Sequence, residues 1–178
     1  MVDSMASAIN AYELPKNPTV LVANLPYNVS VPVLLNLLER FPTLREGVVM
    51  VQAEVADRLA AKPNNKDFGV PSLKGAWWAD LDQAGNISRS VFWPVPNVDS
   101  KLVYFRRHDP LGDEEFRKRV FALIDAAFSQ RRKMIRSAMS SVLGLHAESI
   151  IAAAGVDPTL RGEALDIEAY CKIANQMQ

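Results

Sequence analysis

The chain has 178 residues, of which 49% are hydrophobic, so it is long enough for one medium-sized domain, or a domain with a small appendix, around a real core. Its 20 basic and 20 acidic residues cancel, so net charge does not indicate a nucleic-acid binder and any RNA-binding surface must be local. One cysteine and two histidines exclude an internal disulfide and argue against a zinc site, and we predict no metal.

The apolar runs of the chain are too short for a membrane helix. Residues 19–23 form one of the longest, far below the roughly 20 residues that a bilayer crossing needs. The N-terminal residues contain neither a basic leader nor an apolar signal core. We therefore expect a cytoplasmic protein with no membrane contact.

The first part of the chain predicts strands alternating with helices. Residues 18–25 are β-rich and apolar without polar alternation, which favours a central strand buried on both faces of a parallel sheet. Ser30 then suits the N-cap of a helix that ends near residue 40. Residues 47–52 predict a second buried strand, and residues 54–61 predict a second helix.

The middle of the chain predicts a helix followed by a pair of strands. A polar loop at 62–66 ends the preceding helix, and apolar residues recur at helical spacing over 71–81. Residues 87–92 and 101–107 have strand composition and are separated by Pro94 and Pro96. We expect these two strands to form an antiparallel pair.

The character of the sequence changes after residue 110, where strand signals disappear. We place a domain boundary there, with an incomplete α/β domain over 1–110 and a small all-α domain over 111–178. Gly155 suits the position just beyond the end of a helix. The helices predicted in the second domain cover residues 113–128, 132–143, 146–154 and 166–176.

Asn24-Leu25-Pro26-Tyr27 lies where the first strand ends and a helix is about to begin, which is where open α/β sheets bind ligands. Methylation of an adenine amino group fits these residues, because that nitrogen is a poor nucleophile until its hydrogens are held. The Asn24 amide oxygen and the Pro26 carbonyl can accept those hydrogens, while the flat Tyr27 ring can stack on the base. Without further context, a turn that ends a strand explains the same four residues equally well.

Six separate segments make the chain resemble the small-subunit ribosomal RNA adenine N6-dimethyltransferases of the KsgA type. The resemblance extends over essentially all 178 residues. It implies an incomplete Rossmann-like class I methyltransferase domain followed by a helical RNA-binding domain. The segments are residues 24–30, 51–59, 62–69, 92–100, 128–136 and 155–161.

The resemblance implies an enzyme of ribosome biogenesis that uses S-adenosylmethionine to dimethylate two adjacent adenosines near the 3′ end of small-subunit rRNA, with the 30S particle as partner. Asn24, Leu25, Pro26 and Tyr27 match the catalytic motif of the family. Phe92 matches the aromatic residue that sandwiches the flipped adenine together with Tyr27. Without the resemblance, an adjacent Phe-Trp pair at a strand end would be interpreted as core filling.

The binding residues for the methyl donor have few counterparts in the sequence. The chain contains no Gly-x-Gly turn, and 23 residues precede Asn24, too few for the βα units that normally come before the motif. Asp3, with the small and apolar residues after it, resembles a further donor motif, although a frayed tail explains it too. Asp3 and Asn24 are therefore the candidate donor contacts.

We expect from this gap that the chain is a fragment that binds S-adenosylmethionine weakly or not at all and is itself inactive. The strand that ends at Asn24 would then have an unpaired edge with apolar residues uncovered. We accordingly predict self-association, by edge-to-edge strand addition or by exchange of a segment.

A basic segment at 131–136 lies between the first two helices of the second predicted domain. A basic cluster taken alone is more often a solvated face. In the family this segment faces the RNA-binding cleft between the two domains, and a polar loop could extend that surface. The predicted phosphate contacts are Arg131, Arg132, Lys133 and Arg136, with Lys62 and Lys66 from the loop.

Two other functions stay open at this point. The first is a non-catalytic RNA-binding or ribosome-assembly factor that kept the fold without the donor. The second is a related adenine methyltransferase that acts on large-subunit rRNA, as the erythromycin-resistance methylases do, or on DNA. The Phe-x-Pro-x-Pro segment at 92–96 and the long helical tail favour the small-subunit enzyme over the second alternative.

Overall fold

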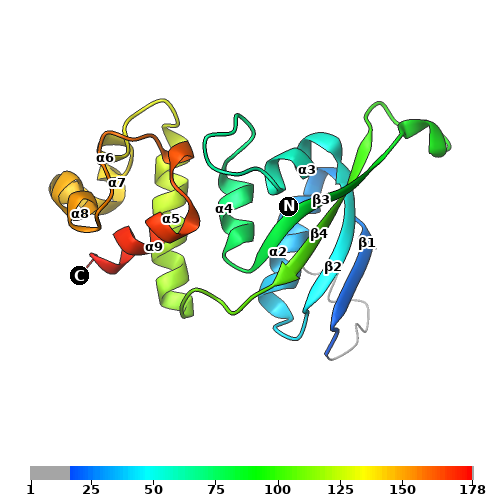
Figure 1. Ribbon diagram of the computed structural model, residues 1–178, viewed down its shortest axis with the longest axis horizontal. Helices are drawn as coiled ribbons and strands as arrows, with labels where there is room; N and C mark the ends of the chain where they lie inside the picture. The colour runs from blue at the N-terminus through cyan, green and yellow to red at the C-terminus, as the bar shows by residue number, and fades with distance from the viewer. Residues whose placement is uncertain (1–16, 178) are drawn as a thin grey trace. The chain divides into compact units, whose positions relative to one another are not determined.

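The computed structural model describes residues 17–177, so Asp3 lies outside the described residues. The chain divides into two compact units (Figure 1). The first contains the described residues up to Ala60 together with Trp78–Asp109, and the second contains Ala61–Trp77 and the chain from Pro110 onward. The sequence did not predict that 61–77 groups with the C-terminal helices. A domain boundary near residue 110 stays a prediction.

The first unit is built on a mixed four-stranded sheet with the order β1-β2-β4-β3. β1 (Val20–Asn24) is parallel to β2 (Glu46–Gln52), which is antiparallel to β4 (Ser100–Arg107). β4 in turn is antiparallel to β3 (Ala79–Ile87). The predicted parallel pair is therefore confirmed, whereas the antiparallel partner of β4 is residues 79–87 and not the predicted 87–92.

The prediction that β1 is a central strand buried on both faces is wrong for the described residues. β1 forms one edge of the sheet, and Val20 and Val22 expose 55% and 80% of their surface. A run of apolar residues indicates a strand, but periodicity carries no information about how many strands flank it. The unpaired edge is the feature that the sequence analysis associated with self-association.

Helix α2 (Ser30–Arg40) follows β1 after a single 3₁₀ turn, η1 (Tyr27–Val29). The prediction that Ser30 is the N-cap is wrong, because η1 continues directly into the helix and Val29 takes the N-cap position. The Ser30 hydroxyl instead donates to the Tyr27 carbonyl at 3.2 Å. This bond ties the start of the helix to the turn that carries the motif.

Two predicted elements in the middle of the chain are displaced. The helix is shorter than the predicted range of 71–81. In the structure α4 spans Val70–Ala76, and β3 begins at Ala79. The predicted strand over 87–92 is wrong, since β3 already ends at Ile87. Buried Ala79 and Leu81 alternate with exposed acidic residues, which is a strand pattern. That alternation overrides the weaker helical spacing of the same residues.

The segment between β3 and β4 extends beyond the strands in Figure 1 and is organised by its own polar contacts. It contains a short 3₁₀ turn, η2 (Arg89–Val91), capped by the Ser88 hydroxyl, which accepts the Ser90 N–H. The backbone N–H of Arg89 donates to an Asp99 carboxylate oxygen at 2.9 Å. The two ends of the segment are thereby held together, and the Trp93–Pro94 peptide bond within it is cis.

The second unit is helical among its described residues. The predicted helices are found, except that the one at 132–143 is divided at Met139, where the backbone turns. Gly155 follows the end of α8 with φ of +73°, as predicted. After α4, the α-helices are α5 (Glu114–Ser129), α6 (Ile135–Ala138), α7 (Ser140–Leu143), α8 (Ala147–Ala153) and α9 (Ile167–Asn175).

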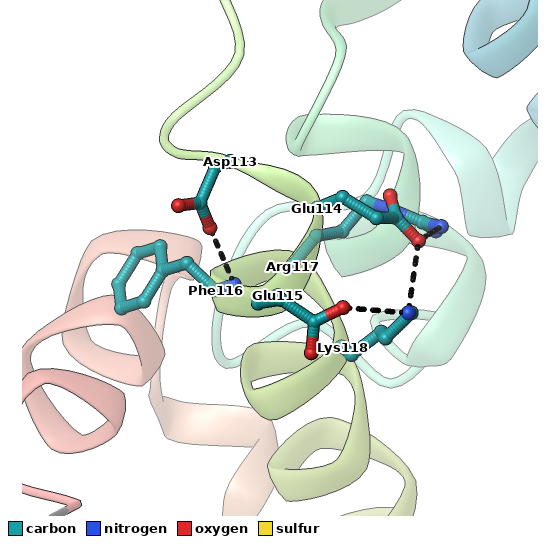
Figure 2. Close-up of polar contacts among 6 residues, drawn as sticks. All are labelled: Asp113, Glu114, Glu115, Phe116, Arg117 and Lys118. Atoms are coloured by element: carbon teal, nitrogen blue, oxygen red, sulfur yellow. Dashed lines mark hydrogen bonds and ion pairs between the residues drawn. The ribbon is translucent and has the colours of Figure 1, made fainter.

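The longest helix, α5, begins at a well-formed N-terminus (Figure 2). The Asp113 carboxylate accepts the backbone N–H of Phe116 at 2.8 Å, which satisfies one of the free donors of the first turn. Glu114 and Glu115 follow and complement the positive end of the helix dipole. The start of α5 is therefore encoded locally, which is why the sequence predicts it within one residue.

Each unit has its own apolar core. Within residues 17–177, no helix combines the length and the hydropathy that a bilayer crossing requires. The largest fully buried side chains of the first unit are Leu34, Leu38, Leu44, Leu59 and Phe105. Those of the second unit are Leu73, Trp77, Leu123, Ile124, Ile135, Met139 and Tyr170.

Candidate active site and RNA-binding segment

A pocket of about 440 Å³ lies at the carboxyl end of β1, formed by the turn after this strand and by the segment between β3 and β4. The structure thus brings the whole predicted motif together with Phe92, although the two segments are distant in the sequence. The lining residues are Asn24, Leu25, Pro26, Tyr27, Phe92, Trp93, Pro94 and Pro96.

Asn24 and Leu25 occupy the last positions of the β1 ladder. The Leu25 backbone N–H donates to the Met50 carbonyl at 3.1 Å, and Leu25 is only 5% exposed. Leu25 therefore anchors the turn, while the neighbouring Asn24 side chain is exposed at the pocket. Among residues 17–177, the Asn24 side chain makes no hydrogen bond, so its amide oxygen is available to a ligand.

The backbone carbonyls of the motif differ in their availability. The Pro26 carbonyl oxygen accepts the Val29 N–H at 3.2 Å, which occupies one of its two lone pairs. The Leu25 carbonyl accepts no hydrogen bond from the part of the chain that the structure describes. Besides the Pro26 carbonyl expected from the sequence, the Leu25 carbonyl is therefore a candidate acceptor, with both lone pairs free.

Tyr27 is fixed by a partner that the sequence analysis missed. Its hydroxyl lies 2.7 Å from the hydroxyl of Ser100, which is completely buried at the start of β4. Because this bond joins the turn after β1 to a strand two places away in the sheet, it limits the motion of the Tyr27 ring. Ser100 belongs to the 92–100 segment that carried part of the family resemblance, but no local pattern connects it with Tyr27.

The aromatic residues opposite the motif are not core residues. Phe92 is half-buried, and Trp93 exposes 94% of its surface. The interpretation of this pair as core filling is therefore wrong. Phe92 and Tyr27 both line the pocket, although they are far apart in the sequence.

The structure brings the candidate adenine contacts together among residues 17–177, but not the candidate donor contacts. Asn24 is the single candidate donor contact among residues 17–177, and one side chain does not make up a site for a molecule the size of S-adenosylmethionine. Asp3 lies outside the described residues.

The basic segment at 131–136 contains two arginines that have structural partners. Arg131 pairs with Glu163 at 2.7 Å and donates to the Lys66 carbonyl at 2.8 Å. Arg136 pairs with Glu148 at 3.1 Å. These two guanidinium groups hold parts of the second unit together, and the prediction that they contact phosphate stays untested.

The remaining cations of the segment are better placed for a ligand. Arg132 and Lys133 are exposed and form no ion pair within residues 17–177. The Arg131 contact brings the exposed Lys66 next to them, and Lys62 is exposed in the same loop. The structure thus joins the predicted loop and the predicted basic segment on one unit.

Other proteins of known structure share this fold. A dimethyladenosine transferase from Plasmodium falciparum has a TM-score of 0.75 and is 18% identical, with 96% of this chain and 74% of that chain covered. The 23S rRNA methyltransferase ErmE has a TM-score of 0.66, also at 18% identity, with 99% and 77% covered. The fold is therefore that of a Rossmann-like methyltransferase.

Sequence comparison identifies the family. Residues 4–178 match the ribosomal RNA adenine dimethylase family. The chain belongs to this family, whose members are methyltransferases that use S-adenosylmethionine as methyl donor.

Curated relatives named ribosomal RNA small subunit methyltransferase A are similar to most of the chain. Those of Paenarthrobacter aurescens and Leifsonia xyli are both 56% identical, over 96% and 95% of this chain. That of Thermobifida fusca is 55% identical over 95%. The matched region spans 59%, 61% and 60% of these relatives, so the chain corresponds to about three fifths of their length.

Proposed function

We propose that this chain forms the base-binding and RNA-binding part of an enzyme that dimethylates the N6 amino groups of two adjacent adenosines near the 3′ end of small-subunit rRNA. The observation that carries the proposal is the pocket shared by Asn24, Tyr27 and Phe92. The relatives at 55–56% identity are named as small-subunit enzymes, which favours this substrate over large-subunit rRNA.

The adenine amino group is activated by hydrogen-bond acceptors. Its nitrogen lone pair is delocalised into the ring until both hydrogens are held out of the conjugated geometry. The free amide oxygen of Asn24 accepts one hydrogen, and a carbonyl of Leu25 or Pro26 accepts the other. The methyl group comes from S-adenosylmethionine, and the nitrogen loses its proton readily after alkylation.

The target base reaches this position by leaving its stack. Tyr27 and Phe92 provide aromatic faces for the extruded adenine, and stacking on such a ring contributes about 1–3 kcal/mol per base. The Ser100 bond holds Tyr27 in place before the base arrives, so little ordering is needed on binding.

The basic segment completes the RNA contact. Arg132, Lys133 and Lys66 have exposed side chains without ion pairs among residues 17–177, so they can approach phosphate without losing an existing partner. The substrate particle is the 30S subunit, and the cytoplasm is the compartment that this substrate implies for a bacterial enzyme.

The free edge of β1 is a surface for self-association. Val20 and Val22 are exposed along an edge whose backbone groups face no strand among the described residues. Strand addition between two copies would cover this edge. Light scattering at tens of micromolar should detect a dimer that Val22→Lys weakens, whereas a monomer at that concentration would contradict the assignment.

The proposed activity is tested in a segment-exchange protein, in which this chain replaces the matching part of the Paenarthrobacter aurescens relative. The substrate is 30S particles that lack the two dimethyladenosines, with S-adenosylmethionine carrying a labelled methyl group. Mass spectrometry of rRNA fragments then locates the label. We expect two adjacent dimethyladenosines near the 3′ end of small-subunit rRNA.

Two results would contradict the proposal. One is a folded segment-exchange protein without methyl transfer, under conditions in which the unaltered relative is active. The other is methylation at a different site, for example in large-subunit rRNA.

A further inference from the structure

Trp93 is an unusual residue because its indole is almost fully in water. It exposes 94% of its surface, whereas the other two tryptophans, Trp77 and Trp78, expose 1% and 7%. Tryptophan carries the largest apolar side chain and is highly buried on average. An exposed indole at the rim of a candidate binding pocket therefore indicates a surface that meets a ligand.

The backbone of the segment that carries this indole is fixed by hydrogen bonds. The segment that carries it is closed at its base by Asp99, whose carboxylate accepts the Arg89 N–H and whose carbonyl accepts the Ala53 N–H at 3.0 Å. The Arg89 guanidinium also donates to the Asn97 carbonyl at 3.2 Å. Pro94 follows Trp93 directly and restricts the chain further. Little backbone freedom is therefore lost when the ring stacks on a ligand.

The proposed function assigns the pocket lined by Tyr27 and Phe92 to one target base, but the proposed substrate has two adjacent adenosines. When one adenine enters the pocket, the neighbouring nucleotide is covalently tied to its rim. Trp93 is the most exposed aromatic residue of the pocket lining and directly follows Phe92 in the chain. A flat apolar ring stacks on any base, because every base has a π-face.

We propose that the Trp93 indole stacks on the base next to the target adenine and so positions the pair of adenosines for successive methylation. This proposal rests on the proposed function, because it takes the pocket as the site of the target base. Trp93 is a positioning residue in this account, since it touches the neighbouring nucleotide and not the reacting nitrogen.

The test measures binding of the full chain to short single-stranded RNAs. Fluorescence anisotropy of dye-labelled RNA gives the affinity of every variant, and the tryptophan fluorescence of the unaltered chain is recorded as well. One oligomer contains two adjacent adenosines flanked by uridines, and a second has an abasic ribose in place of the adenosine next to the target. Because Trp77 and Trp78 are buried, quenching by stacked bases reports on Trp93. The variants are Trp93→Leu, which removes the flat ring, Trp93→Phe, which restores a smaller one, and Phe92→Leu, which alters the pocket.

We expect the two-adenosine RNA to quench the fluorescence and the abasic RNA to quench it much less. Trp93→Leu should weaken binding of the two-adenosine RNA about fivefold or more, the lower end of what removing a stacking ring costs, with partial recovery in Trp93→Phe. The same substitution should hardly change binding of the abasic RNA.

The outcomes separate this proposal from the proposed function. If Phe92→Leu weakens binding but Trp93→Leu affects both RNAs equally or neither, the role of Trp93 is wrong and the pocket assignment stands. If Trp93→Leu acts only on the two-adenosine RNA while Phe92→Leu has no effect, Trp93 contacts RNA and the pocket assignment fails. A chain whose fluorescence and binding respond to neither RNA contradicts both.

Discussion

The hydroxyl groups of Tyr27 and Ser100 lie 2.7 Å apart and connect the turn after β1 with the first residue of β4. Ser100 is fully buried and lies within the sheet, opposite Gln52 on one side and Ile87 on the other. Tyr27 is half-buried, with its ring at the pocket. A strand of the sheet therefore determines where the Tyr27 ring lies at the pocket.

This relationship predicts unequal effects of removing either hydroxyl. Tyr27→Phe leaves the buried Ser100 oxygen without its partner and should lower the free energy of unfolding by about 1–3 kcal/mol. Ser100→Ala leaves the hydroxyl of half-buried Tyr27, which water can reach, so its cost should be smaller. Urea denaturation measures both changes.

The matched control is Tyr104→Phe, which removes an exposed hydrogen bond to Glu46. Its effect should be within about 1 kcal/mol, because water replaces an exposed bond. Equal losses in Tyr27→Phe and Tyr104→Phe would show that the buried pair has no special role.

Asn24→Ala should separate activity from stability. The side chain is exposed and makes no hydrogen bond among residues 17–177, so the free energy of unfolding should change by less than about 0.5 kcal/mol. Loss of one positioned acceptor should lower methyl transfer by the segment-exchange protein roughly 10²- to 10³-fold. Asn28→Ala, an exposed asparagine outside the pocket lining, is the control and should leave the rate unchanged. Near-normal methylation by the Asn24 variant would exclude it as an acceptor.

Arg131 and Arg132 are adjacent but should respond differently to substitution by alanine. Arg132→Ala should reduce the slope of log K against log salt for single-stranded RNA by about 0.7, which corresponds to one lost phosphate contact, without a change in stability. Arg131→Ala breaks the contacts with Glu163 and Lys66 and should lower the free energy of unfolding by about 1 kcal/mol. An unchanged salt slope for Arg132→Ala would identify it as a merely solvated residue.

Cys171 is the single cysteine of the chain, and its reactivity should be low at neutral pH. Burial raises the pKa of its thiol from 9.0 to about 11, and the carboxylates of Glu168 and Asp166 add to this shift. At pH 8 the reactive thiolate should be about 100-fold scarcer than for an ordinary thiol, with a matching fall in the rate of alkylation by iodoacetamide.

The raised pKa of Cys171 also makes the free energy of unfolding depend on pH. Below pH 9 the thiol is neutral in both the folded and the unfolded chain, so it has no effect on the equilibrium. Between pH 9 and about 11 the unfolded chain ionises first, so the folded state should lose stability as the pH rises. Alkylation at the rate of a small thiol at pH 8 would contradict the shift.

Local chemistry explains which parts of the fold could be predicted from the sequence. The start of α5 at Asp113, the turn at Gly155 and the position of Asn24 at a strand end are each determined by a few neighbouring residues. The displaced β3 shows the limit, because residues 79–81 fit a helical spacing and a strand alternation at the same time. Pairing with β4 decides between them, and this pairing is not a local property.

The candidate site likewise contains residues that the sequence could predict and contacts that it could not. The Asn24-to-Tyr27 motif could be recognised because its four residues are contiguous, and Phe92 was found through a second contiguous segment. The Tyr27–Ser100 bond and the Arg131–Glu163 ion pair join residues that only the tertiary fold brings together. The exposure of Trp93 likewise depends on where the β3–β4 segment extends, which composition does not encode.

The account depends most on the claim that Asn24 holds the amino group of an extruded adenine. It is tested most directly by comparing the affinities of the chain for two single-stranded RNAs, one with adenosine and one with purine riboside, which lacks only that amino group. The adenosine RNA should bind more tightly, by about 2- to 12-fold for each of the two hydrogen bonds of the amino group, and Asn24→Ala should reduce the difference to that of the remaining carbonyl bond. Equal affinities for the two RNAs, or a preference of unchanged size in the Asn24→Ala protein, would contradict the claim.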